Sequence, residues 1–207
     1  MSTRMSQLLR KVLLFGQGMD QRDKAAAIAN LIAGLRPFFE TRGFKYEKTH
    51  QAFVKQTNAL SWSFGLGLFV HPDAFTITPV GSVRHEQVEQ IFWRVALSPD
   101  AFQRDSATVL WSWALEKHTP KPHCFTVDRT SKVSLGVSFV ERFFTSWAEP
   151  FFREHCDLAA ISNSYNDGRN ILRAKFITDP FEMLAKALIA AKSLFEKCLT
   201  TYLRELT

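Results

Sequence analysis

Apolar residues between positions 20 and 42 recur every three to four places, the spacing of one helix face. This stripe consists of Ile28, Leu31, Ile32, Leu35, Phe38 and Phe39. Arg42 and the following Gly43 are typical of the carboxyl end of a helix. We therefore predict a long helix over residues 20–42. We expect a kink or a break at Pro37, because an internal proline removes a hydrogen bond and costs about 3 kcal/mol.

The next forty residues change to alternation of apolar and polar positions, which is typical of strands. The predicted strands cover residues 44–48, 52–57, 60–72 and 74–83. The connections between them are too short for crossovers, so the strands must be antiparallel. In the third strand, Trp62 and Phe64 share one face, whereas Gly65 and Gly67 lie on the other. The glycines indicate that another segment crosses that face closely.

Further elements follow from the same periodicities. They are a short helix over 6–15, a helix over 85–97, strands over 107–117 and 123–128, and helices over 131–155 and 179–206. The turn at 119–122 makes the two strands partners. Asp179, Pro180 and Glu182 form a capping box at the start of the last helix. Residues 157–170, which include Asn163, Ser164 and Gly168, are predicted as a loop.

These elements predict an α+β protein. Its antiparallel sheet would have about five or six strands, with long amphipathic helices packed on one face. A chain of 207 residues fits one such domain over 1–207, with residues 1–18 as an N-terminal extension.

Phenylalanine dominates the aromatic residues, with 19 Phe against 5 Trp and 3 Tyr. Because Phe carries no polar group, most of these rings should lie in a core. A Pro-Phe-Phe sequence occurs twice, at 37–39 and 150–152, through duplication of a half-domain or through chance in a Phe-rich chain. In either case we expect both Phe pairs to be buried.

The chain has a formal charge of +6, but its basic residues are scattered rather than clustered. Such a charge favours acidic partners at long range and says nothing about fold. Binding to nucleic acid is therefore an alternative function.

Three widely spaced cysteines without a Cys-x-x-Cys motif are typical of reduced thiols in a cytoplasmic protein. Near the N-terminus, the apolar run at 12–15 is too short for a signal peptide. No segment reaches the roughly 18 apolar residues that span a membrane. We therefore expect a cytoplasmic protein without membrane association.

No stretch of the sequence carries a recognised catalytic, cofactor or metal motif. The segment 118–124 contains His118, His123 and Cys124, but lacks four ligands at a known zinc spacing. The two Gly-x-Gly sequences lack the lysine and helix start of a phosphate loop. We interpret His71 and His85 as residues on a solvated face, although either could act as an acid or a base. We predict no catalytic residue, no cofactor and no metal; an enzyme of unknown type is a third function.

Aromatic side chains supply the candidate binding residues, because Trp buries a large area at little entropic cost. Most of these rings should be core, and a Trp left on an outer face would mark an interface. The predicted partner-binding residues are Trp93, Trp111, Trp113, His71 and His118.

Residues 36–70 resemble a bacterial domain family of unknown function. The resemblance is carried by the turn Gly43-Phe44-Lys45, the strand at 64–69, and the onward segments at 77–80 and 83–85. It covers about half of the chain and is structural rather than catalytic. Domains of this family are often found near polymorphic toxins, which implies an immunity role. We therefore expect a non-enzymatic protein-binding module, in this reading an immunity protein that occludes a cognate bacterial toxin.

Overall fold

A computed structural model describes residues 18–57, 59–96, 107–112 and 124–166, together with 186, 188–193, 195–196 and 204. The helices and helical turns are α2 (Gln21–Glu40), α3 (Glu86–Ala96), η2 (Thr130–Lys132), α5 (Val133–Phe143), the π-turn η3 (Phe144–Ala148), α6 (Glu149–Glu154) and α7 (Leu158–Asn166). The strands are β1 (Lys45–Glu47), β2 (Ala52–Gln56), β3 (Leu60–Gly65), β4 (Leu68–Val70), β5 (Phe75–Ile77), β6 (Val80–His85), β7 (Val109–Ser112) and β8 (Phe125–Val127). The predicted helix over 6–15 and most of that over 179–206 lie outside the described residues.

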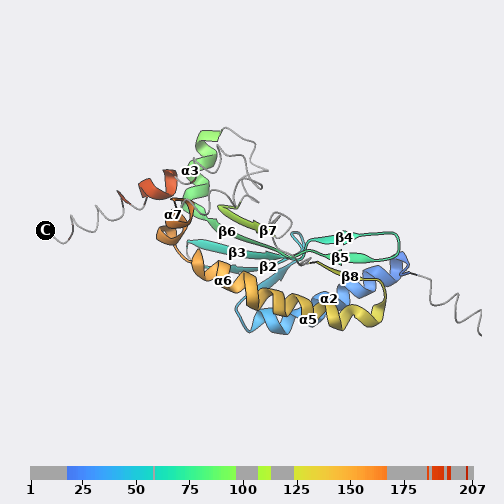
Figure 1. Cartoon of the computed structure of the whole chain (residues 1–207). Helices are drawn as coiled ribbons and strands as arrows, with labels where there is room; N and C mark the ends of the chain where they lie inside the picture. The colour runs from blue at the N-terminus through green and yellow to red at the C-terminus, as the bar shows by residue number, and fades with distance from the viewer. Residues whose placement is uncertain are drawn as a thin grey trace, which may run out of the picture.

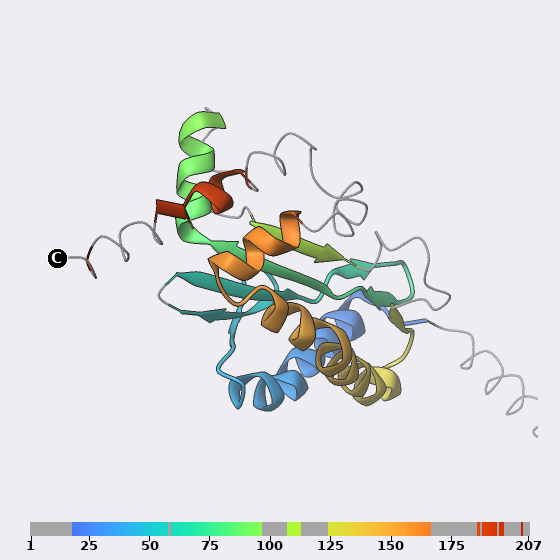
Figure 2. The same ribbon diagram turned by 60° about the vertical axis from the view of Figure 1, so that its left-hand side comes forward.

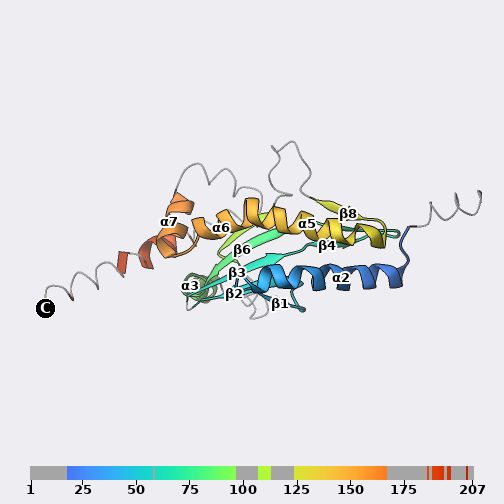
Figure 3. The same cartoon turned by 90° about the horizontal axis from the view of Figure 1, so that it is seen from below.

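The strands form two antiparallel sheets. The large sheet has the order β1-β2-β3-β6-β7, and the small sheet has the order β4-β5-β8. Helices α2, α5 and α6 cover one face of this layer, as Figures 1 and 3 show. The predicted α+β class, with an antiparallel sheet and helices on one face, is confirmed.

A bend divides one long hairpin between the two sheets. The chain predicted as single strands over 60–72 and 74–83 breaks at 66–67 and at 78–79, so these two predictions are wrong. Gly67 takes a φ of +52°, and a Cβ there would lie 2.1 Å from the Thr78 carbonyl oxygen. The Thr78 N–H donates to the carbonyls of Leu66 at 3.1 Å and Gly67 at 3.0 Å. Of the two glycines expected to be crossed closely, only Gly67 is, at the point where the hairpin bends; a Cβ at Gly65 would lie 3.8 Å from its nearest neighbour.

The predicted pairing of the strands over 107–117 and 123–128 is wrong. β7 pairs with β6, where Val109 lies opposite Val83, and β8 pairs with β5, where Thr126 lies opposite Thr76. β5 and β6 are the two halves of one bent strand, so β7 and β8 line successive parts of the same side. Periodicity determines which residues share a face, but it does not determine the partner strand.

The expected loop over 157–170 is helical from Leu158 to Asn166. The Asp157 carboxylate accepts a hydrogen bond from the Ala160 N–H at 2.8 Å, and the Asp157 carbonyl accepts one from the Ile161 N–H at 3.0 Å. These bonds satisfy free N–H groups at the start of α7. Leu158 and Ile161 are buried, which outweighs the polar composition of the segment.

Pro37 does not break α2, which continues through it to Glu40. The proline is exposed and lies in the last turn, where few hydrogen bonds depend on it. The Thr41 N–H still donates to the Pro37 carbonyl at 3.3 Å. The alternative of a break at Pro37 is therefore wrong.

The core is a cluster of aromatic rings between the helices and the large sheet. Phe39 stacks on Phe53 with ring centroids 4.0 Å apart, and its ring meets Phe144 edge-on at 4.9 Å. Phe152 stacks on Trp62 at 5.8 Å. Both predicted Phe pairs contribute to this core, with Phe38 half-buried and the other three buried. The same cluster includes Phe75, Ile77 and Val127 of the small sheet, so one core supports both sheets.

Candidate functional site

The predicted partner-binding residues do not converge. Trp93 lies on α3 and is half-buried, whereas His71 follows β4 and is exposed. These two elements lie at opposite ends of the molecule (Figures 1 and 2). The backbone of Trp111 in β7 pairs with Gly81, and Trp113 and His118 lie outside the described residues. The structure therefore offers two separate sites: a polar cluster at the α3 end and the small sheet.

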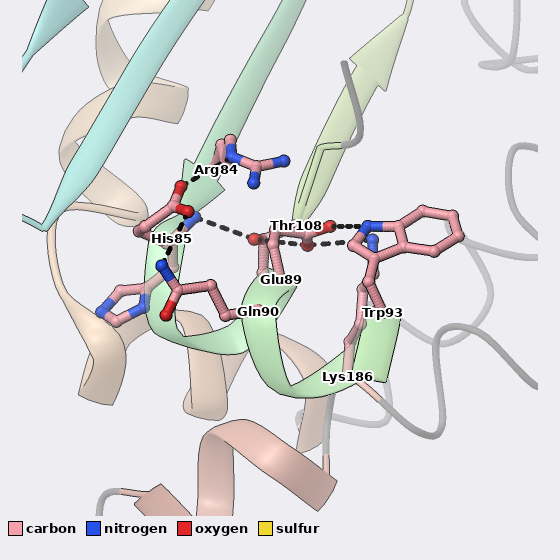
Figure 4. Close-up of polar contacts among 8 residues, drawn as sticks. Arg84, His85, Glu89, Gln90, Trp93, Thr108 and Lys186 are labelled. Atoms are coloured by element: carbon pink, nitrogen blue, oxygen red, sulfur yellow. Dashed lines mark hydrogen bonds and ion pairs between the residues drawn. The ribbon is translucent and has the colours of Figure 1, made fainter. Parts of the chain in front are cut away.

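The polar cluster at the α3 end is built around the carboxylate of Glu89, which is 0% exposed (Figure 4). Its oxygens accept hydrogen bonds from the Thr108 hydroxyl at 2.8 Å and the Trp93 indole N–H at 3.2 Å. The Lys186 ammonium lies 2.9 Å from the same carboxylate, and that side chain is 1% exposed. Glu89 and Lys186 were not predicted as site residues from the sequence, although Trp93 follows Glu89 at the i, i+4 spacing of one helix face.

The cluster joins segments that are far apart in the sequence. Lys186 also donates to the Ala107 carbonyl at 2.7 Å, and Thr108 accepts from the backbone N–H of His85 at 2.8 Å. The charge of this buried carboxylate is therefore compensated by an ammonium group and two hydrogen-bond donors. These contacts hold α3, the start of β7 and Lys186 together, which is a structural role.

His85 lies beside this cluster and is 6% exposed, so its expected place on a solvated face is wrong. The last residue of β6 points into the core, since it shares a sheet face with Val83. Burial lowers the pKa of the His85 imidazole below its ordinary 6.5, while the charges of Asp157, Glu86 and Glu89 oppose that shift. The Nδ1 atom of His85 is buried and has no hydrogen-bond partner among the described residues.

The small sheet exposes apolar side chains at its β4 edge. Phe69 is 58% exposed and Val70 is 56% exposed. No other strand in the described part of the chain pairs with β4 on the side away from β5. On the outer face, the His71 imidazole lies 3.1 Å from the Thr76 hydroxyl, which lies 3.1 Å from the Thr126 hydroxyl.

The hydrogen bonds to β5 show which backbone groups of β4 face outward. The His71 N–H donates to Ala74 at 2.9 Å, and the Thr78 N–H donates to Gly67 at 3.0 Å. Hydrogen-bonded pairs recur at every second residue of an antiparallel ladder, so the backbone of Phe69 also faces β5. The N–H and carbonyl groups of Leu68 and Val70 therefore point to the open edge.

The turn that follows β4 is held by buried contacts. The Lys24 ammonium of α2 donates to the carbonyls of His71 and Pro72, each at 2.7 Å, and Lys24 is only 5% exposed. The Met19 N–H donates to the Asp73 carbonyl at 2.8 Å. These bonds fix the end of the hairpin, so the β4 edge is presented in a defined position.

The described residues contain no group of three or more His, Cys, Asp and Glu side chains that could hold a metal ion. Within those same stretches, no helix is both long and apolar enough to cross a membrane.

Comparison with known proteins adds no relative: no family model, no curated protein and no solved structure matches the chain.

Proposed function

We propose that this protein is a non-enzymatic protein-binding module and that its interface is the β4 edge of the small sheet. The observation that carries the proposal is the exposure of Phe69 and Val70 on a strand with no described partner on its outer side. Unpaired strand edges bind other strands through their backbone groups, and proteins that avoid such contacts place charges or proline there. Residues 66–71 contain no Asp, Glu, Lys, Arg or Pro.

The positions of the two exposed side chains favour contact along the edge. Phe69 lies opposite Thr76, which is on the outer face, whereas Val70 lies opposite Phe75, which is buried on the inner face. The two apolar side chains therefore project on opposite faces of the sheet. A partner lying on one face would cover only one of them, but an added strand would cover both.

The rigidity of the edge also supports binding. Lys24 and Met19 hold the neighbouring turn, so little conformational entropy would be lost when a partner strand pairs with β4. The formal charge of +6 would speed the approach of an acidic partner, with an on-rate that falls as salt rises.

A toxin as the partner is the more specific form of this proposal. It rests on the resemblance of residues 36–70 to a family found near toxins, and an immunity protein would act by covering the toxin's active surface.

Site-specific photocrosslinking in the native cell tests the proposal. A benzophenone side chain replaces Phe69, and the matched control carries it at Leu135 of α5, which is 57% exposed. We expect a discrete crosslinked protein, identified by mass spectrometry, from position 69 and not from position 135. Equal products from the two positions, or none from position 69, would refute an interface at β4.

A further inference from the structure

We infer that a second copy of this chain occupies the β4 edge, pairing β4 with β4 in antiparallel fashion to form a continuous six-stranded sheet. This inference rests on the proposed function, because it names the occupant of the same edge. It follows from the hydrogen-bonding pattern of β4, the position of its exposed side chains and its lack of charge.

The outward backbone groups of β4 are complementary to themselves. Leu68 and Val70 both direct their N–H and carbonyl groups to the open edge, two residues apart. A twofold axis at Phe69 places Leu68 of each copy opposite Val70 of the other. Each of these pairs can exchange both backbone hydrogen bonds, as in an ordinary antiparallel ladder. The contact is closed, because the same patch is used on both copies.

The side chains fit the same register. Phe69 would face its own counterpart in a non-hydrogen-bonded pair, where side chains approach most closely and aromatic pairs stabilise a sheet. Phe69 and Val70, now 58% and 56% exposed, would each gain a cross-strand apolar neighbour. Pro72, which has no N–H, and Gly67, with its φ of +52°, limit the pairing to the short strand between them.

The edge itself carries no charge that would oppose a second copy. The chain carries a formal +6, and two such chains repel at long range. The segment 66–72 has no Lys, Arg, Asp or Glu, so no like charges would meet at the contact. A second copy of this uncharged strand can therefore pair with it in the register given by the backbone groups.

Sedimentation of the purified full chain tests the inference. We expect a species of twice the 23.7 kDa chain mass, with Val70→Lys and Val70→Pro shifting it to the single-chain mass. Proline at 70 removes an outward N–H and leaves the bonds to β5 intact, so the hairpin should still fold. Leu135→Lys adds the same charge at an equally exposed apolar position and should leave the pair intact.

Cysteine crosslinking tests the register, in a chain whose Cys124, Cys156 and Cys198 are replaced by serine. Phe69→Cys should form an intermolecular disulfide, because the Cα atoms of such a pair lie about 4.5 Å apart. Val70→Cys should not, since its Cα would lie about 8 Å from its counterpart, beyond disulfide reach.

The inference would be overturned by any of three results. The wild-type chain could stay monomeric at all concentrations, the dimer could be unaffected by both Val70 variants, or the two cysteine variants could crosslink equally. If position 69 instead crosslinks to a different protein in the cell, the inference fails and the proposed function stands. If position 69 contacts neither, both fail.

Discussion

Replacing Lys186 with methionine measures how far the buried ion pair at the α3 end stabilises the fold. Glu89 is 0% exposed and the Lys186 side chain is 1% exposed, so solvent cannot compensate a charge left alone there. The variant would leave the Glu89 carboxylate with hydrogen bonds from Thr108 and Trp93 but without its cation. Removing one partner of a buried pair costs about 3–5 kcal/mol, and we expect that loss in the free energy of unfolding.

A double-mutant cycle separates the pair from its individual residues. In Glu89→Gln/Lys186→Met no buried charge remains, so we expect the double variant to be more stable than the sum of the single losses by about 2 kcal/mol. The matched control is Lys192→Met, whose side chain is 77% exposed and lies 3.7 Å from Glu196. An exposed pair of this kind contributes less than about 1 kcal/mol.

Urea unfolding at pH 7, followed by circular dichroism, provides the free energies of the four members of the cycle and of the control variant. A Lys186→Met variant within about 1 kcal/mol of the wild type would refute the reasoning. Additive losses in the double variant would refute it as well, because they would show that the two charges do not interact.

Three further predictions concern the bend, the hairpin turn and the buried histidine. Gly67→Ala should lose about 2 kcal/mol or more in urea unfolding, because its Cβ would meet the Thr78 carbonyl at 2.1 Å. Gly65→Ala, with its nearest contact at 3.8 Å, should be tolerated, and equal losses would contradict the bend as the cause. Lys24→Met should lose about 2 kcal/mol and speed amide hydrogen exchange in β4, because two carbonyls lose their buried donor; unchanged exchange would exclude an anchoring role. Burial lowers the pKa of His85 in the folded state, so the unfolded state binds the proton more readily and stability should fall as the pH drops below 6.5. In unfolding measurements from pH 7 to pH 5, His85→Gln should reduce that fall; a variant with the same slope as the wild type would contradict the prediction.

Much of the fold could be predicted because its helices and hairpins are local. The stripe over 20–42 and the alternation over 44–65 each depend on residues close in sequence, and α2, β1, β2 and β3 follow them. The bend could not be predicted, because Gly67 turns the chain only when Thr78 crosses it. The partner of β8 depends on the same bend, and α7 depends on the burial of Leu158 and Ile161 against distant segments.

The polar cluster at the α3 end was less accessible to sequence reasoning than the β4 edge. Glu89 follows Glu86 on a helix that reads as amphipathic, and nothing nearby in the sequence shows that only Glu89 is buried. Its cation, Lys186, comes from near the other end of the chain. Residues 68–70 belong to the single strand predicted over 60–72, and their separation as the outer strand of a second sheet depends on the bend and on β8 pairing with β5 rather than with β7.

Two buried lysines, Lys186 and Lys24, lie near the two ends of the bent hairpin and make different contacts. The Lys186 ammonium forms an ion pair with the Glu89 carboxylate, which also accepts hydrogen bonds from Thr108 and Trp93. The charge of that carboxylate is therefore compensated at the α3 end. Lys24 instead donates to two carbonyls of the turn after β4, which fixes the strand while its outward backbone groups stay available. Burying an ammonium group without a carboxylate is costly, and the two hydrogen bonds to carbonyls offset that cost at Lys24. An uncharged strand edge that is held in place and has apolar side chains on both faces is suited to strand pairing. This property supports both the proposed interface at β4 and the pairing of β4 with a second copy.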